Sequence, residues 1–215
     1  MPYVCLLLSG AALLVNGLAT LGHLPRRDAA VLSLMVGTVQ LVLGAVVLSL
    51  GGAAGTAPTA AGILLFGLTY AYAGLDTLLG LGAKGLGWFC GMVALVAVLL
   101  AFFWLPADSL LAVLWLAWAV LWGLMLASLA LGRSGLDHFM GWALVLASQV
   151  TATVPAFLGM AGLWPRSAPV AAGAAGLLGL MFLAAGILSR RRPAGTWRAA
   201  DKPGTLATLP REPWR

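Results

Sequence analysis

The sequence predicts an all-α membrane protein, a bundle of seven transmembrane helices with the amino terminus outside and the carboxyl terminus in the cytoplasm. Three observations predict this fold. Hydrophobic residues make up 62% of the 215 residues and charged residues only 8%, whereas a soluble domain carries about 25% charged residues. The apolar residues gather in seven runs, each close to the roughly 20 residues that a helix needs to cross a bilayer. The basic residues lie almost entirely on one side of these runs.

The seven runs are expected to be helices because lipid offers the backbone no hydrogen-bond partners. In chain order they cover residues 3–22, 30–50, 60–80, 86–105, 109–131, 140–162 and 168–188. Each gap between them contains glycine or proline, which interrupt helices. The first run follows Met-Pro-Tyr with no basic residue ahead of it, so we interpret it as a retained span and not as a signal peptide.

Lysine and arginine set the orientation. One set of loops holds Arg26, Arg27, Lys84 and Arg133, and the opposite set holds only Arg166. The remaining basic residues lie in the tail, 190–215, whose prolines and glycines predict a disordered cytoplasmic segment. With an outside amino terminus, eleven of the twelve basic residues face the cytoplasm, as the positive-inside rule requires. The chain is therefore expected to be a multi-pass protein of the inner (plasma) membrane.

Few polar residues interrupt the spans, and each is a candidate for function. The set comprises Asn16, Gln40, Thr69, Tyr70, Tyr72, Gln149, Thr151 and Thr153. An amide within a span either serves the function or only hydrogen-bonds a neighbouring helix. Both interpretations stay open for Gln40 and Gln149. Asp76, near the inner end of the third run, is expected to be a solvated carboxylate at the interface.

Three tryptophans mark the fifth run. Trp115, Trp118 and Trp122 are spaced i, i+3 and i+7, so they share one helical face. Interfacial belts are the usual place for tryptophan, but Trp118 and Trp122 fall near the middle of their span. Phe66 and Tyr70, at i and i+4, offer a second ring face. The pattern alone slightly favours aromatic packing, and the alternative is the lining of a pore.

What the sequence lacks narrows the function further. The runs hold no pair of acidic and basic residues near the membrane middle, as proton-coupled transporters usually need. No nucleotide-binding loop, metal-ligand cluster, or nucleophile with a base is evident. We therefore expect no enzyme activity, no metal, no cofactor and no nucleic-acid partner. Cys5 and Cys90 lie in apolar runs and are expected to be small buried residues.

Four segments resemble the AmiS/UreI family of urea channels and short-chain amide transporters. They are Asn16-Gly17, residues 66–73 (FGLTYAYA), residues 115–122 (WLAWAVLW) and residues 151–156 (TATVPA). The resemblance extends over about residues 1–163. It implies a six-helix channel core, 1–163, to which the seventh helix, 164–189, is an addition. It also implies a homo-hexameric ring in membrane lipid, in which each protomer passes urea or small amides through its own pore.

The resemblance implies a set of pore-lining residues as well. Its motif positions match Asn16, Phe66, Tyr70, Trp115, Trp118 and Trp122, and we add the polar residues Thr69 and Gln149 to this lining. In the family's urea channel a glutamate stands where this chain has Ala147, and Gln149 is the nearest polar residue. The added seventh helix is expected at the periphery, with its Gly173–Gly179 face against another helix.

The leading hypothesis is a passive, ion-excluding channel for urea or short-chain aliphatic amides such as acetamide. We expect no acid gating, because the outer loops are short and both histidines, His23 and His138, fall on the cytoplasmic side. Two alternatives stay open. One is an ion-coupled active transporter of a related small solute, for which Asp76 is the only candidate coupling site. The other is a membrane scaffold that transports nothing.

Overall fold

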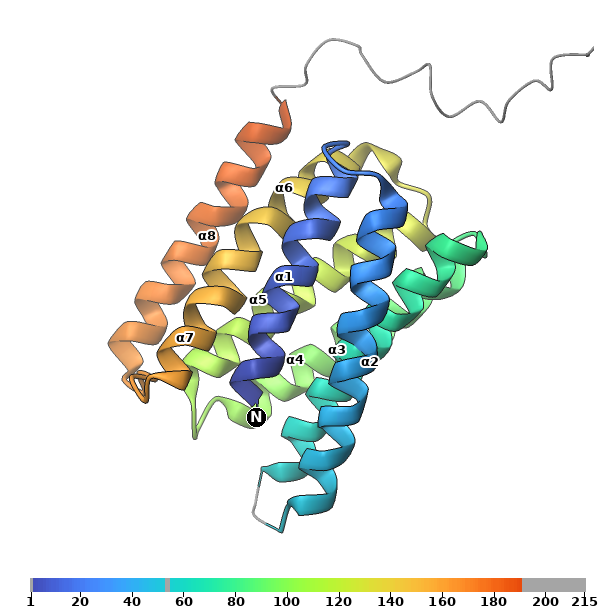
Figure 1. Ribbon diagram of the computed structural model, residues 1–215. Coiled ribbons are helices and arrows are strands. Elements are labelled where there is room, and N and C mark those ends of the chain that lie inside the picture. The colour runs from blue at the N-terminus through green and yellow to red at the C-terminus, as the bar shows by residue number, and fades with distance from the viewer. Residues whose placement is uncertain (1, 53–54, 191–215) are drawn as a thin grey trace, which may run out of the picture.

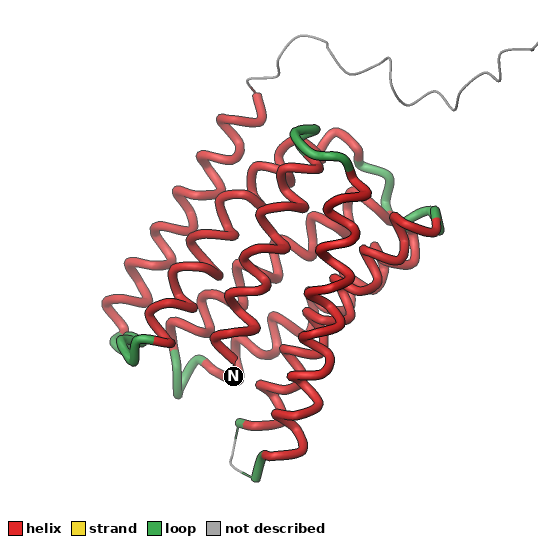
Figure 2. Tube along the Cα trace, in the orientation of Figure 1, coloured by secondary structure: helices red, strands yellow, loops and turns green. Residues whose placement is uncertain are grey.

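The computed structural model describes residues 2–52 and 55–190, and every regular element in these ranges is helical (Figures 1 and 2). The elements are, in order, α1 (Pro2–Thr20), α2 (Arg26–Leu50), α3 (Thr56–Leu79), α4 (Lys84–Trp104), α5 (Ser109–Met125), η1 (Leu126–Ala130), η2 (Ser134–Leu136), α6 (Asp137–Ala147), η3 (Ser148–Thr153), α7 (Val154–Met160) and α8 (Ala168–Arg190). The predicted tail, apart from Arg190, lies outside the described residues.

Seven of the described helical segments are long and apolar enough to cross a membrane. The fifth segment runs from Ser109 to Ala130 and joins α5 to the π-helical turn η1, and the sixth runs from Ser134 to Met160 and joins η2, α6, η3 and α7. The prediction of an all-helical, seven-span membrane protein is therefore confirmed, and the protein is a multi-pass protein of the inner membrane.

The sixth span contains a π-helical turn, η3, for a local reason. Pro155 follows that turn, and a proline inside a helix has no N–H to donate and crowds the carbonyl four residues earlier. The wider turn relieves this conflict, and the Thr153 hydroxyl donates to the Ser148 carbonyl at 2.9 Å. Turns of this type often occur at functional sites, because they change which side chains face inward.

Helix α1 joins the two sides of the bundle. This helix contacts α2 and α3, and also α6, η3 and α7, while α2 pairs with α3 and α4 pairs with α5 (Figure 1). Glycine allows α2 and α3 to approach closely: a Cβ on Gly37 would lie 2.7 Å from the Gly67 carbonyl oxygen, and one on Gly67 would lie 3.1 Å from the Gly37 oxygen. Such small-residue contacts drive helix association in lipid, where no hydrophobic effect separates the helices from their solvent.

Helix α8 lies at the periphery, against α6 and α5 (Figure 1). Its buried residues are Ala171, Leu178, Met181 and Ala185. Gly173, Gly176 and Gly179 face away from the bundle, since a Cβ at any of them would meet no atom of the described residues within 4 Å. The peripheral position was expected, but the glycine face does not pack on another helix of this chain.

Candidate solute pathway

Two cavities lie in the bundle and share part of their lining. The first, the polar cavity, has a volume of about 230 Å³ and is bounded by Asn16, Thr69, Tyr70, Asp76, Trp122 and Ser128, among others. The second, the aromatic cavity, also has a volume of about 230 Å³ and is bounded by Tyr3, Gln40, Trp104, Trp115 and Trp164, among others. Phe66 and Trp118 line both. The two cavities therefore meet at these rings, one reaching toward each end of the bundle.

The constriction between the cavities is a cluster of four buried rings. The centroid of Phe66 lies 5.9 Å from that of Trp115, 5.1 Å from that of Trp118 and 4.6 Å from that of Trp122, each pair edge to face. Trp115 and Trp118 are themselves 5.0 Å apart and nearly perpendicular. Edge-to-face contact is the arrangement that the ring quadrupoles favour. The tryptophans of α5 thus share one face, as their spacing predicts, and that face meets Phe66 of α3.

A hydrogen bond sets the position of Trp118. Its indole Nε1 donates to the Thr151 hydroxyl at 3.1 Å, and that hydroxyl donates to the Ala147 carbonyl at 2.7 Å. Thr151 and Ala147 are fully buried. The π-helical turn η3 carries Thr151, so the irregular backbone of the sixth span controls a ring of the fifth. Thr151 was not among the predicted pore residues, although it belongs to the sixth-span motif that carries the family resemblance.

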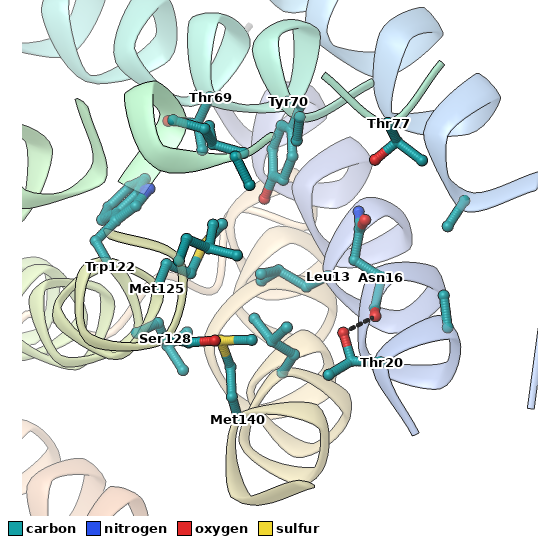
Figure 3. Close-up of a pocket in the computed structure, with 18 of the residues that line it drawn as sticks. Leu13, Asn16, Thr20, Thr69, Tyr70, Thr77, Trp122, Met125, Ser128 and Met140 are labelled. Atoms are coloured by element: carbon teal, nitrogen blue, oxygen red, sulfur yellow. Dashed lines mark hydrogen bonds between the residues drawn. The ribbon is translucent and has the colours of Figure 1, made fainter. Parts of the chain in front are cut away.

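The polar cavity gathers hydroxyl and amide groups from α1 and α3 (Figure 3). The Asn16 amide nitrogen donates to the Ala12 carbonyl at 2.8 Å and to the Ser33 hydroxyl at 2.7 Å. Thr69 donates its hydroxyl to the Leu65 carbonyl at 2.8 Å. Figure 3 shows Asn16, Tyr70 and Trp122 around the same space. These groups offer polar contacts to a solute on the side of the constriction opposite the amino terminus.

The structure places seven of the eight predicted pore residues along these cavities. Phe66 and Trp118 line both, Trp115 lines the aromatic cavity, and Asn16, Thr69, Tyr70 and Trp122 line the polar cavity. Gln149 lines neither. It lies on the exposed face of the sixth span and donates to the neighbouring Ser148 hydroxyl at 3.0 Å. The turn η3 points Ser148 and Thr151 inward and Gln149 outward, so we leave Gln149 out of the pathway.

Asp76 does not have the solvated position that the sequence suggested. It is 8% exposed, and its carboxylate accepts a hydrogen bond from the Ala83 backbone N–H at 2.9 Å. Ala83 has a φ of +60°, a conformation that costs a non-glycine residue energy and needs such support. Asp76 thus stabilises the turn between α3 and α4, at the end of the polar cavity.

Two hydrogen bonds and one ring contact order the mouth of the aromatic cavity, and the sequence did not reveal them. The Trp164 indole N–H donates to Asp108 Oδ2 at 2.7 Å, and Oδ1 of the same carboxylate accepts from the Leu111 backbone N–H at 2.9 Å and caps α5. The Trp164 ring also lies 5.5 Å from the ring of Tyr3. In the sequence, Trp164 lies in the short gap between the sixth and seventh runs, with no pattern that marks it.

Within a bundle of membrane-spanning helices, two cavities that meet at a ring constriction define a multi-pass membrane transport protein. The sequence profile described as AmiS/UreI family transporter matches residues 1–163, and the chain belongs to this family. Helix α8 lies beyond the matched region.

Individual relatives agree with this assignment. The chain is 44% identical over 197 residues to the transporter protein AmiS2 of Rhodococcus erythropolis, covering 90% of this chain and 96% of the relative. It is 34% identical over 207 residues to an amidate substrates transporter protein of Mycolicibacterium smegmatis, covering 94% of this chain and 96% of the relative. The crystal structure of the urea channel from Helicobacter pylori matches with a TM-score of 0.69 at 30% identity, covering 77% of this chain and all of that chain.

The hydrogen bond between Trp118 and Thr151 can be tested by substitution. Thr151→Val keeps the side-chain shape but leaves the buried indole N–H unpaired, at a cost of about 1–3 kcal/mol, so we expect the ring to shift and the flux of acetamide through reconstituted protein to fall several-fold. Thr151→Ser keeps the hydroxyl and serves as the matched control. Equal flux through both variants would show that this hydrogen bond does not position the ring.

Proposed function

We propose that the protein is a passive, ion-excluding channel for urea and short-chain aliphatic amides such as acetamide. The observation that supports this most strongly is the pair of cavities joined at Phe66 and Trp118. The names of the relatives point to the same solutes: two are named as transporters, one of them for amidate substrates, and one is a urea channel.

The chemistry of the constriction suits these solutes. Urea and acetamide are flat, neutral and strongly dipolar, so they can pass between ring faces without removing a full charge from water. A polar group left unpaired in an apolar environment costs about 2–7 kcal/mol, and the hydroxyl and amide groups beside the rings reduce that cost. Because the groups are few, the solute is not held so tightly that it cannot leave.

Ion exclusion follows from where the charges lie. In the described lining, charged side chains occur near the ends of the helices: Arg26, Asp76 and Asp137 in the polar cavity, and Asp108 in the aromatic cavity. The four rings of the constriction carry no charge. Moving an ion from water into a medium of low dielectric costs of the order of 20 kcal/mol in the ideal case. We infer that neutral solutes pass the rings and ions do not.

The orientation that we propose puts the polar cavity on the cytoplasmic side. Arg26, Arg27, Lys84, Arg133 and Arg190 lie at the end of the bundle that the polar cavity reaches, whereas Arg166 lies at the amino-terminal end. This distribution agrees with the positive-inside rule. The aromatic cavity, with Tyr3 and Trp164 at its mouth, then faces the outside.

We further propose a closed homo-hexamer with one pathway in each protomer. Both cavities lie inside the bundle of a single protomer, which suits a separate pathway in each subunit. The family resemblance favours a ring, and closed symmetry is the rule for homo-oligomers. Helix α8 packs on α5 and α6, which leaves α2, α3 and α4 able to meet other protomers.

Passive transport can be tested in proteoliposomes. We expect urea and acetamide to equilibrate across the membrane, without accumulation, at rates unchanged when proton and sodium gradients are collapsed, because the constriction offers no ion site. Stopped-flow light scattering gives the rates, and protein-free vesicles are the control. Accumulation of either solute that an ionophore abolishes would instead establish ion-coupled transport.

We also propose that external acid does not open this channel. Histidine is the side chain that ordinarily titrates between about pH 5 and 8, and both histidines, His23 and His138, lie at the end of the bundle opposite the aromatic cavity. The expected result is a nearly constant urea flux between external pH 5 and 8 in vesicles of defined orientation. A steep rise on external acidification would show that a gate exists at the outer end.

A further inference from the structure

Two residues that line the aromatic cavity each carry a buried polar atom with no hydrogen-bond partner within the described residues. The atoms are Oε1 of Gln40 and Nε1 of Trp115. Gln40 is fully buried and Trp115 is 5% exposed. Buried polar atoms in folded proteins are nearly always paired. Here one unpaired atom is an acceptor and the other is a donor.

The identity of the free atom on Gln40 follows from its partners. Its amide nitrogen donates to the Cys5 carbonyl at 2.8 Å and to the Ser9 hydroxyl at 2.8 Å. A backbone carbonyl can only accept, so the nitrogen and not the oxygen must face Cys5. Both N–H groups of the amide are thereby used. The oxygen, with two lone pairs, is left for another partner.

Close packing holds the indole of Trp115 in place. A Cβ on Gly62 would lie 2.7 Å from Cζ2 and 2.8 Å from Cη2 of this ring, so the ring edge rests on the backbone of α3. Its other neighbours are Phe66, at 5.9 Å between ring centroids, and Trp118, at 5.0 Å. Close packing in this position prevents the ring from turning toward a different partner. Its N–H is therefore fixed beside the constriction.

We propose that Gln40 and Trp115 form a subsite for a primary amide group in the aromatic cavity, beside the Phe66–Trp118 constriction. The solute NH₂ donates to Gln40 Oε1, and the solute carbonyl accepts from Trp115 Nε1. A primary amide and urea carry this donor and acceptor on one planar group. The subsite rests on the proposed channel function and adds to it the groups that recognise the solute.

The subsite also explains how an amide can be distinguished from the carboxylate that its hydrolysis yields. A carboxylate has only acceptor oxygens. It could accept from Trp115 Nε1, but its second oxygen would meet Gln40 Oε1, which is also an acceptor. Sites that hydrogen-bond a substrate group reject analogues that lack it, because their own buried groups then stay unpaired.

Two substitutions test the subsite independently. Gln40→Met removes the acceptor with an unbranched side chain, and Trp115→Phe removes the donor without touching the bonds from Gln40 to Cys5 and Ser9. Leu183→Met and Leu180→Phe, 60% and 64% exposed on the peripheral helix α8, are controls. The full-length protein is reconstituted in vesicles, and acetamide, urea and water permeability are measured by stopped flow.

We expect each test variant to lower acetamide and urea permeability about tenfold, the usual effect of one lost hydrogen bond, with water permeability close to that of the unsubstituted protein. If the Gln40 variant fails to assemble, Trp115→Phe alone decides. Unchanged amide permeability in either assembled variant would overturn the subsite while the channel function stands, and an equal fall in water permeability would also overturn it. An unsubstituted protein that passes neither amide nor urea faster than empty vesicles would contradict the channel function and the subsite together.

Discussion

The contact of Phe66 with the three tryptophans of α5 is the interaction on which the proposed pathway depends. A bundle in lipid must fill its middle with side chains, and here the filling consists of rings that stand edge to face. These rings separate two cavities that would otherwise form one open space. Because ring faces carry no full charge, the same cluster completes the packing of the bundle and, in the function that we propose, sets which solutes can cross it.

Each ring in this cluster is held by a different part of the fold. Trp118 depends on a hydroxyl from the π-helical turn of the sixth span, and Trp115 depends on the absence of a side chain at Gly62. Phe66 lies on α3, whose distance from α2 is set by Gly37 and Gly67. One methyl group added to α3 at Gly62 or Gly67 would therefore alter the constriction.

Features that follow the repeat of a single helix could be predicted from the sequence. Run length predicted the seven spans, and the i, i+3, i+7 spacing predicted the shared face of Trp115, Trp118 and Trp122. It could not show the inward face of the sixth span, because the π-helical turn changes the helical period there and points Gln149 outward.

Contacts between distant segments were also beyond sequence reasoning. Gln40 reaches Cys5, 35 residues away, and Trp164 reaches Asp108, 56 residues away. No periodic pattern encodes either pair, and the sequence left the role of Gln40 open between packing and function.

The central claim is that the solute passes between these rings, and the most direct test is the size of solute that can pass. Trp118→Ala should assemble and raise the permeability of butyramide relative to acetamide several-fold, because the removed indole widens the point where the two cavities meet. Leu180→Ala, on the exposed face of α8, should leave that ratio unchanged. If Trp118→Ala lowers thermal stability but leaves the ratio as it was, the rings only pack the bundle and the solute takes another route.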